Sequence, residues 1–130
     1  MLWLLNMAVE RFGEGWRLAW DGSRQPFSVL IGGEGWAAEL SLAEAEALRE
    51  ALADLVAQHQ ALVEQLMAEE AIELELERGP WWLCLDGDRA SWLLRVLLTP
   101  QPGQRAFEGS WQPAAARAFN QALQQLNGQP

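Results

Sequence analysis

The two residue types most often used in catalysis and metal binding, histidine and cysteine, each occur once in this sequence. His59 is the only histidine, and it lies in the apolar stripe of a predicted helix. Catalysis or metal binding would need a second donor, so we interpret it as a buried histidine that makes one hydrogen bond. Cys84 is the only cysteine and lies in the apolar run Trp82–Leu85. A reactive thiolate needs cationic or helix-terminal surroundings, so we predict a buried, unreactive thiol.

Two short motifs are typical of ligand sites in other proteins, and both have simpler interpretations here. Asp86-Gly-Asp88 suggests calcium, but the further ligands and the bidentate glutamate of an EF-hand loop are missing. Gly32-Gly-Glu-Gly35 is similar to a phosphate-binding loop, but such loops open a helix, whereas this one leads into a predicted strand. We therefore predict turns at both positions and expect no cofactor and no metal.

Carboxylates are concentrated in one short region that ends in a predicted strand. The side chains concerned are Glu69, Glu70, Glu73, Glu75 and Glu77. Within Ile72–Glu77, apolar residues alternate strictly with glutamates, which predicts a half-buried strand with a row of carboxylates on its outer face. Such a row is typical of a solvated strand face, and it can also bind divalent ions or a basic partner.

The sequence contains eight tryptophans. Four share the parity of the apolar strand positions and are expected in the core: Trp16, Trp20, Trp36 and Trp111. Trp81 and Trp82 are adjacent and point to opposite faces of a strand, so one of them is a candidate exposed aromatic. Binding of single-stranded nucleic acid uses aromatic platforms beside a basic groove. Such a groove near Trp82 and Trp92 would have to gather several arginines: Arg17, Arg78, Arg89, Arg95 and Arg105.

The chain has 130 residues, half of them apolar, which is enough for one hydrophobic core and too few for two ordinary domains. We predict a single domain over residues 12–127, a fraying N-terminal segment at 1–11 and a tail at 128–130. Either Met1 or Met7 is a candidate start. Nine arginines, no lysine and eighteen acidic residues give a net charge of −9, which repels polyanions and disfavours nucleic acid as the partner.

The apolar run Leu2–Leu5 lacks a basic leader and is much shorter than a signal-peptide core or a membrane span. We therefore expect a cytoplasmic protein with no membrane association. A single cysteine excludes an intrachain disulfide and fits a reducing compartment.

Hydrophobic periodicity predicts an alternation of strands and helices. Ser41 and Glu44 form a capping box at the start of a long amphipathic helix over Leu42–Glu69, about 42 Å long. Its apolar stripe comprises Ala45, Leu48, Leu52, Leu55, His59, Leu62 and Leu66. Three strands precede this helix, around Trp16–Trp20, Phe27–Ile31 and Trp36–Leu40, and their short connections imply an antiparallel meander.

The second part of the chain predicts the same order of elements. After Ile72–Glu77, a hairpin buried on both faces turns at Asp86-Gly87. Its strands are Trp81–Leu85 and Trp92–Leu98, and a last strand covers Phe107–Trp111. A helix then begins at Pro113, with an apolar stripe of Ala116, Phe119, Leu123 and Leu126, and ends at Asn127-Gly128.

The two parts of the sequence form an internal repeat. Ala45–Leu52 aligns with Ala116–Leu123 at an offset of 71 residues, with the helical apolar positions matched. The repeat predicts an α+β domain of two pseudo-symmetric halves, each an antiparallel β-meander followed by a helix, packed about a pseudo-twofold axis.

The chain resembles a small uncharacterised protein family found in cyanobacteria and plastid-bearing lineages. The likeness rests on Gly15–Asp21, on Leu30–Trp36 with Glu39-Leu40, and on Glu108–Trp111. The architecture of this family is similar to Whirly-type single-stranded-DNA-binding transcriptional regulators, in which the helices of two meander-plus-helix halves cross between the sheets. Whirly proteins use a lysine-containing motif at the nucleic-acid surface, and this chain has no lysine, so we transfer none of those binding residues.

These observations favour a non-enzymatic protein-interaction or regulatory module, with a protein partner or a second copy of the chain as its target. The candidate interaction surface comprises Glu73, Glu75, Glu77, Trp82, Trp92, Arg17 and Arg95. The alternative is a single-stranded nucleic-acid-binding regulator, which requires a locally segregated arginine patch. An enzyme is the least favoured class because the sequence offers no acid–base pairing.

Overall fold

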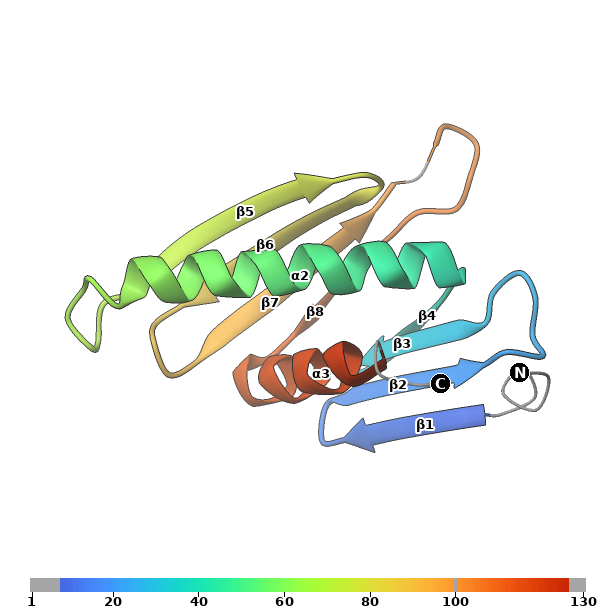
Figure 1. Ribbon diagram of the computed structural model, residues 1–130, viewed down its shortest axis with the longest axis horizontal. Helices are drawn as coiled ribbons and strands as arrows, with labels where there is room; N and C mark the ends of the chain where they lie inside the picture. Colours follow the sequence, from blue (N-terminus) through green and yellow to red (C-terminus); the bar gives the residue numbers. More distant parts are fainter. Residues whose placement is uncertain (1–7, 100, 127–130) are drawn as a thin grey trace.

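The computed structural model describes residues 8–99 and 101–126, and two four-stranded antiparallel sheets and two helices make up this part of the chain (Figure 1). The first half comprises β1 (Ala8–Gly13), β2 (Trp16–Asp21), β3 (Val29–Gly33), β4 (Trp36–Leu40) and α2 (Leu42–Val63). The second half comprises β5 (Ile72–Arg78), β6 (Trp81–Gly87), β7 (Trp92–Leu98), β8 (Phe107–Trp111) and α3 (Pro113–Leu126). The predicted α+β fold, with two halves that each end in a helix, is therefore confirmed.

Each helix packs partly on the sheet of the other half. We call β1–β4 the N-terminal sheet and β5–β8 the C-terminal sheet. Helix α2, which follows β4, lies across β5 and β6, whereas α3, which follows β8, contacts both β2 and β7 (Figure 1). Both helices lie on one side of the sheets, which we call the inner face. The opposite, outer faces carry no helix among the described residues.

The internal repeat is visible in the strand pairing. Phe107 follows Trp36 by 71 positions, and α3 follows α2 by the same interval. In the N-terminal sheet Leu40 is paired with Val29, and in the C-terminal sheet Trp111 is paired with Leu94. The halves differ in two connections. Residues 22–28 join β2 to β3, whereas residues 88–91 join β6 to β7, and Glu34 and Gly35 join β3 to β4, whereas residues 99–106 join β7 to β8.

Strand β1 is absent from the elements predicted from the sequence. It begins at Ala8, inside the segment 1–11 that was placed outside the domain, and Val9 pairs with Trp20 of β2. As an edge strand it has one neighbour, and its residues are mostly exposed. It therefore has no apolar alternation that sequence analysis could detect.

Helix α2 is shorter than predicted. Its capping box is present, because the Ser41 hydroxyl accepts the Glu44 amide and the Glu44 carboxylate accepts the Ser41 amide. The helix ends at Val63 rather than at Glu69, at a length of about 33 Å. Short i to i+3 bonds follow, including Leu66 N to Val63 O at 3.0 Å, and they tighten the last turn. Leu62, expected in the apolar stripe, is 46% exposed, and Val63 takes the buried position after His59.

The β6–β7 hairpin also turns later than predicted. Strand β6 continues through Gly87, and the turn is built on Asp88, whose Oδ1 accepts the amides of Ala90 and Ser91 at 2.9 Å each. These amides lower the pKa of the Asp88 carboxyl. The predicted end of the last helix at Asn127-Gly128 lies outside the described residues.

Indole side chains join the two halves. Trp111 Nε1 of β8 donates to Gly32 O of β3 at 2.8 Å, and Trp36 Nε1 of β4 donates to Ser110 O of β8 at 3.1 Å. Gly109 makes the close approach possible, since a Cβ there would lie 2.6 Å from Cζ2 of Trp36. Trp111 is fully buried as predicted, whereas Trp16, Trp20 and Trp36 are partly buried and pack against the core. The residues of the family resemblance thus include the joint between the halves.

Candidate functional site

The outer face of the C-terminal sheet brings together five of the seven candidate residues. Residues paired across neighbouring strands share a face, so the register of β5–β8 defines its members. We call this surface the outer C-terminal face. It comprises Glu73, Glu75, Glu77, Trp82, Cys84, Asp86, Leu93, Arg95, Leu97, Glu108 and Ser110.

The charge on this face is strongly unbalanced, with five carboxylates and one guanidinium. Arg95 lies over the Trp82 ring, with Cζ 5.2 Å from the ring centroid, and its Nη2 is 4.0 Å from Glu108 Oε2. Within residues 8–99 and 101–126, none of the ion pairs includes Glu73, Glu75 or Glu77. These three carboxylates therefore stand along edge strand β5 without a neutralising cation.

The centre of the outer C-terminal face is apolar and half-buried. Trp82 and Leu97 are directly paired, and Leu93 lies farther along β7. The hairpin was expected to be buried on both faces, but its outer face is only half-buried and Arg95 is exposed, because no helix covers it.

Cys84 is 1% exposed between these side chains, which confirms the predicted burial. Burial, and next the nearby Glu73 carboxylate, raises the pKa of the Cys84 thiol.

Two candidate residues lie elsewhere. Trp92 is 7% exposed on the inner face of β7, where Arg117 of α3 lies over it with Cζ 6.0 Å from the ring centroid. Arg17 belongs to the outer face of the N-terminal sheet and pairs with Glu10 at 3.0 Å. Neither side chain contributes to the outer C-terminal face.

The arginines predicted to form a nucleic-acid groove do not gather beside Trp82, where Arg95 is the one guanidinium on the outer C-terminal face. All nine lie in the described part of the chain, and each guanidinium has an intramolecular partner. Six pair with carboxylates: Arg17, Arg24, Arg49, Arg78, Arg95 and Arg105. The other three bond backbone carbonyls: Arg11, Arg89 and Arg117. A phosphate bound through these same N–H groups would compete with the existing bonds.

His59 joins α2 to the C-terminal sheet. Its ring is 2% exposed, and Nε2 lies 3.2 Å from Gly87 O and 3.4 Å from Ile72 O. Both partners are carbonyl oxygens, so Nε2 carries a proton and donates it. His59 thus holds the ends of β5 and β6 against the helix, and the predicted buried, hydrogen-bonded histidine is confirmed.

Comparison with protein families places this geometry in a known group. Residues 11–126 match the family described as Domain of unknown function (DUF1818). The chain belongs to this family. A crystal structure from Prochlorococcus sp. NATL2A, described as a protein with unknown function from the DUF155 family, is similar to this DUF1818 chain at 39% identity. The match covers 91% of this chain and 98% of that one, with a TM-score of 0.85. No curated protein matches the chain.

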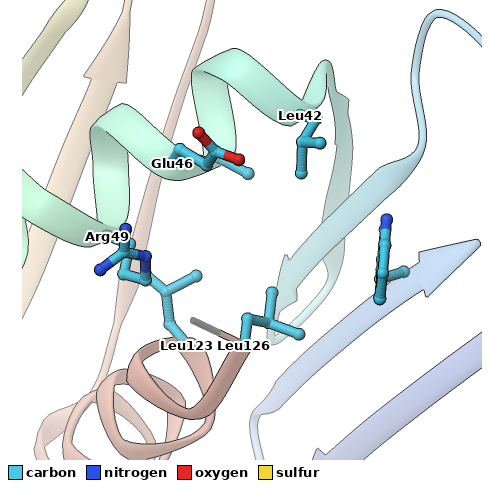
Figure 2. A pocket seen from close by; sticks show the side chains of 7 residues that line it. Leu42, Glu46, Arg49, Leu123 and Leu126 are labelled. Atoms are coloured by element: carbon cyan, nitrogen blue, oxygen red, sulfur yellow. The ribbon is translucent and has the colours of Figure 1, made fainter. Parts of the chain in front are cut away.

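This chain also has an open hollow of about 320 Å³ between α2, α3 and β2 (Figure 2). Leu42 of α2 lies across this hollow from Leu126 of α3, and Glu46 and Arg49 lie along α2. Trp20 of β2 also lines the hollow. Three of these five side chains are apolar, and the two charged ones belong to one helix.

The described residues of this DUF1818 protein contain no group of three or more His, Cys, Asp or Glu placed to hold a metal ion. In the same residues, no helix is long and apolar enough to cross a membrane.

Proposed function

We propose that this protein is a non-enzymatic interaction module whose outer C-terminal face binds a basic segment of another protein. The observation that supports this proposal is the row of Glu73, Glu75 and Glu77, which forms no ion pair within residues 8–99 and 101–126 and borders the half-buried Trp82 and Leu97. Carboxylates in such a position attract a cationic chain, and an indole with a neighbouring leucine provides the apolar anchor typical of interfaces.

The charge pattern favours a basic occupant over a second copy of the chain. Strand β5 is the free edge of the C-terminal sheet. If two copies paired through this edge, their glutamate rows would lie opposite one another, and like charges directly opposite destabilise strand pairing. A lysine- or arginine-rich strand at the same edge would place opposite charges together. We therefore propose a basic protein segment as the partner, and homodimerisation is the alternative that the experiment tests.

Acidic residues on an edge strand also have a purely structural use, because charges discourage edge-to-edge aggregation. The two roles differ in what the rest of the face contributes. Edge protection needs only Glu73, Glu75 and Glu77, whereas binding also needs Trp82. Binding of a basic peptide that depends on both sets distinguishes the two roles.

The experiment is a calorimetric titration of the full chain with a nonapeptide of alternating lysine and leucine, and with a matched glutamate–leucine peptide. We expect saturable binding of the basic peptide only. The triple variant E73Q/E75Q/E77Q and the single variant Trp82→Ala should each weaken it at least about tenfold, equivalent to about 1.4 kcal/mol. Sedimentation of the chain alone reports whether it self-associates.

A matched control separates a local effect from net charge. E14Q/E34Q/E46Q removes the same number of carboxylates from exposed positions outside the outer C-terminal face. This control should change the dissociation constant less than about twofold. Absence of saturable binding at about 100 µM peptide, or equal losses in both triple variants, would contradict the proposal.

A second candidate function, binding of single-stranded nucleic acid, is supported by one observation and by the resemblance to Whirly-type regulators. Arg95 lies over Trp82 on an open sheet face, an arrangement on which a base can stack. The five carboxylates around this pair oppose a phosphate backbone. Fluorescence anisotropy with a labelled oligothymidine at low salt tests the idea. Binding at tens of micromolar that is lost in Trp82→Ala would favour nucleic acid over a basic peptide.

A further inference from the structure

A second hollow, on the helix side of the molecule, has a different character from the outer C-terminal face. It measures about 310 Å³ and lies between the C-terminal part of α2, helix α3 and the β6–β7 hairpin. Its lining includes the buried His59 and Trp92, together with Arg89, Arg117, Asn120 and Glu64. In a chain of net charge −9, two arginines, both solvent-exposed, thus line one small open hollow.

Arg89 and Arg117 differ from most arginines of the chain because their partners are neutral. Arg89 Nη2 donates to Leu66 O at 3.0 Å and to Val63 O at 3.4 Å, at the end of α2. Arg117 Nη2 donates to Ala90 O at 2.6 Å, in the β6–β7 turn. A guanidinium has five N–H donors. These bonds therefore hold the two side chains in place while leaving positive charge and further donors for a ligand.

The other side chains of the hollow add donors and one opposing charge. Asn120 Oδ1 accepts Gln124 Nε2 at 3.2 Å, so the amide N–H groups of Asn120 remain as donors. Glu64, which accepts Gln60 Nε2 at 3.4 Å, is the one carboxylate in the lining. Asp88 of the adjoining turn has its Oδ1 occupied by the amides of Ala90 and Ser91. Two guanidiniums against one carboxylate leave the lining residues with a net positive charge, and the negative charge of Asp88 belongs to the adjoining turn, outside the lining.

From this geometry we infer that the hollow binds a small oxyanion, the phosphate or paired carboxylates of a small molecule. Arginine side chains recognise both groups through two parallel hydrogen bonds. The volume is at the lower end of the range for small-molecule sites, so the ligand is compact. The inference does not depend on the proposed protein-binding function, because the hollow lies on the helix side and the outer C-terminal face on the opposite side of the sheet.

The test is a titration of the ¹⁵N-labelled full chain, followed by NMR, with inorganic phosphate and separately with succinate. Ionic strength is held constant with sodium chloride. We expect saturable shifts of the backbone amides in the β6–β7 turn and around Asn120, with a dissociation constant below about 1 mM for at least one probe. The probe that binds more tightly distinguishes a phosphate ligand from a dicarboxylate.

Variants give the site its sharpest test. R117Q should weaken binding at least about tenfold, and R117K should lose part of the affinity because lysine cannot bond an oxyanion through a planar fork. E64Q should strengthen binding because it removes the opposing carboxylate. R24Q, which removes an arginine paired with Glu39 on the N-terminal sheet, is the matched control and should leave the affinity unchanged.

Three results would overturn the inference. Shifts that rise linearly with concentration and equal those caused by sodium chloride would show only non-specific ion effects. A loss of affinity in R24Q equal to that in R117Q would remove the assignment to this hollow. Unaltered binding in R117Q would do the same. R89Q would also remove hydrogen bonds at the end of α2, so a loss of binding in that variant could reflect a change in the fold. R117Q removes a bond to a turn carbonyl only, and it is therefore the variant that tests binding in the hollow.

Discussion

The outer faces of the two sheets differ, although the strands beneath them pair in the same register. Where β6 has Trp82 and Cys84, the corresponding positions of β2 are Arg17 and Ala19, as the pairing with β7 and β3 defines. On the N-terminal sheet the acids are paired, with Arg17–Glu10 at 3.0 Å and Arg24–Glu39 at 2.9 Å. On the C-terminal sheet the glutamates of β5 have no such partners among the described residues.

The inner faces are alike where the outer faces differ. Leu18 of β2 corresponds to Leu83 of β6, and Ile31 of β3 corresponds to Val96 of β7, and all four are fully buried. Close packing restricts the size and polarity of inner side chains, whereas outer positions are restricted mainly by solubility. The difference between the outer faces is therefore not imposed by core packing.

The joint between the halves should show the largest effect of any single change. Trp111 is 1% exposed, stacks on Phe119 at 4.1 Å between centroids and donates to Gly32 O. Trp111→Ala should lower the free energy of unfolding by about 3–5 kcal/mol. Trp36→Ala, on the half-exposed side of the joint, should cost about 1–2 kcal/mol less. Urea unfolding followed by circular dichroism measures both.

Equal losses in the two variants would contradict this asymmetry. A biphasic transition in Trp111→Ala would show instead that the halves unfold separately once the joint is broken.

The longer loop of the second half should make the next largest contribution. Arg105 reaches across the joint to the β4–α2 junction, where Nη1 lies 3.0 Å from Glu44 Oε2 of α2 and Nη2 lies 3.1 Å from Glu39 O of β4. In the second half, the position that corresponds to Glu44 is the buried Ala115. R105Q and E44Q should each cost about 1–2 kcal/mol at neutral pH, because both remove charge-assisted bonds at a mostly buried carboxylate. R24Q, which breaks an exposed pair, should cost less than about 1 kcal/mol.

This interaction also predicts the direction of a pH dependence. Burial raises the pKa of the Glu44 carboxyl, but hydrogen bonds from Arg105 and Ser41 outweigh it and hold the pKa below its usual value of 4.5. The contribution of Glu44 to stability is therefore complete above pH 4.5 and is lost as the pH falls through the lowered value. The stability of E44Q should vary less with pH over this acid range, and parallel curves for the two proteins would contradict the assignment.

The two helix starts should differ by a smaller amount. Ser41 caps α2 through a capping box, whereas α3 begins with Pro113 directly after Gln112, and proline is favoured at a first helical position. Ser41→Ala should cost about 1 kcal/mol, and Gln112→Ala should stay within about 0.5 kcal/mol. Thermal unfolding of both variants measures these changes in stability, and similar losses of stability would mean that Gln112 also caps a helix.

Much of the fold was predictable because periodicity is strong where a face is buried. The alternation in Ile72–Glu77 and the capping box at Ser41 identified elements that the structure confirms. Strand β1 was missed because an edge strand with exposed residues has no apolar period, although the internal repeat implies a strand in the first half that is equivalent to β5. The contact of Arg105 with Glu44 joins residues 61 positions apart through a loop, and no local pattern specifies it.

The candidate surface was predictable only in part, and Trp92 shows where a signal was available. Trp92, Leu94, Val96 and Leu98 alternate with the row that contains Arg95, so the row with the arginine must face solvent and Trp92 must face the core. The hollow with Arg89 and Arg117 was not predictable, because those side chains meet only after α3 packs on β7. Sequence patterns therefore place residues on faces, whereas the packing of helices decides which faces share a cavity.

Substitution of Cys84 should have the smallest effect on stability, and the reactivity of its thiol tests whether the outer C-terminal face is tightly packed. Its counterpart in the first half is Ala19, so the backbone tolerates a smaller side chain there, and Cys84→Ala should cost about 1 kcal/mol or less. Burial raises the pKa of the thiol, with Glu73 next in effect, and the thiolate is therefore scarce at neutral pH. A disulfide reagent should modify native Cys84 far more slowly than the unfolded chain, and the rate should rise with pH. Native modification as fast as that of the unfolded chain would mean that Trp82 and Arg95 leave this position open, and the apolar centre proposed to bind a partner would not be a stable surface.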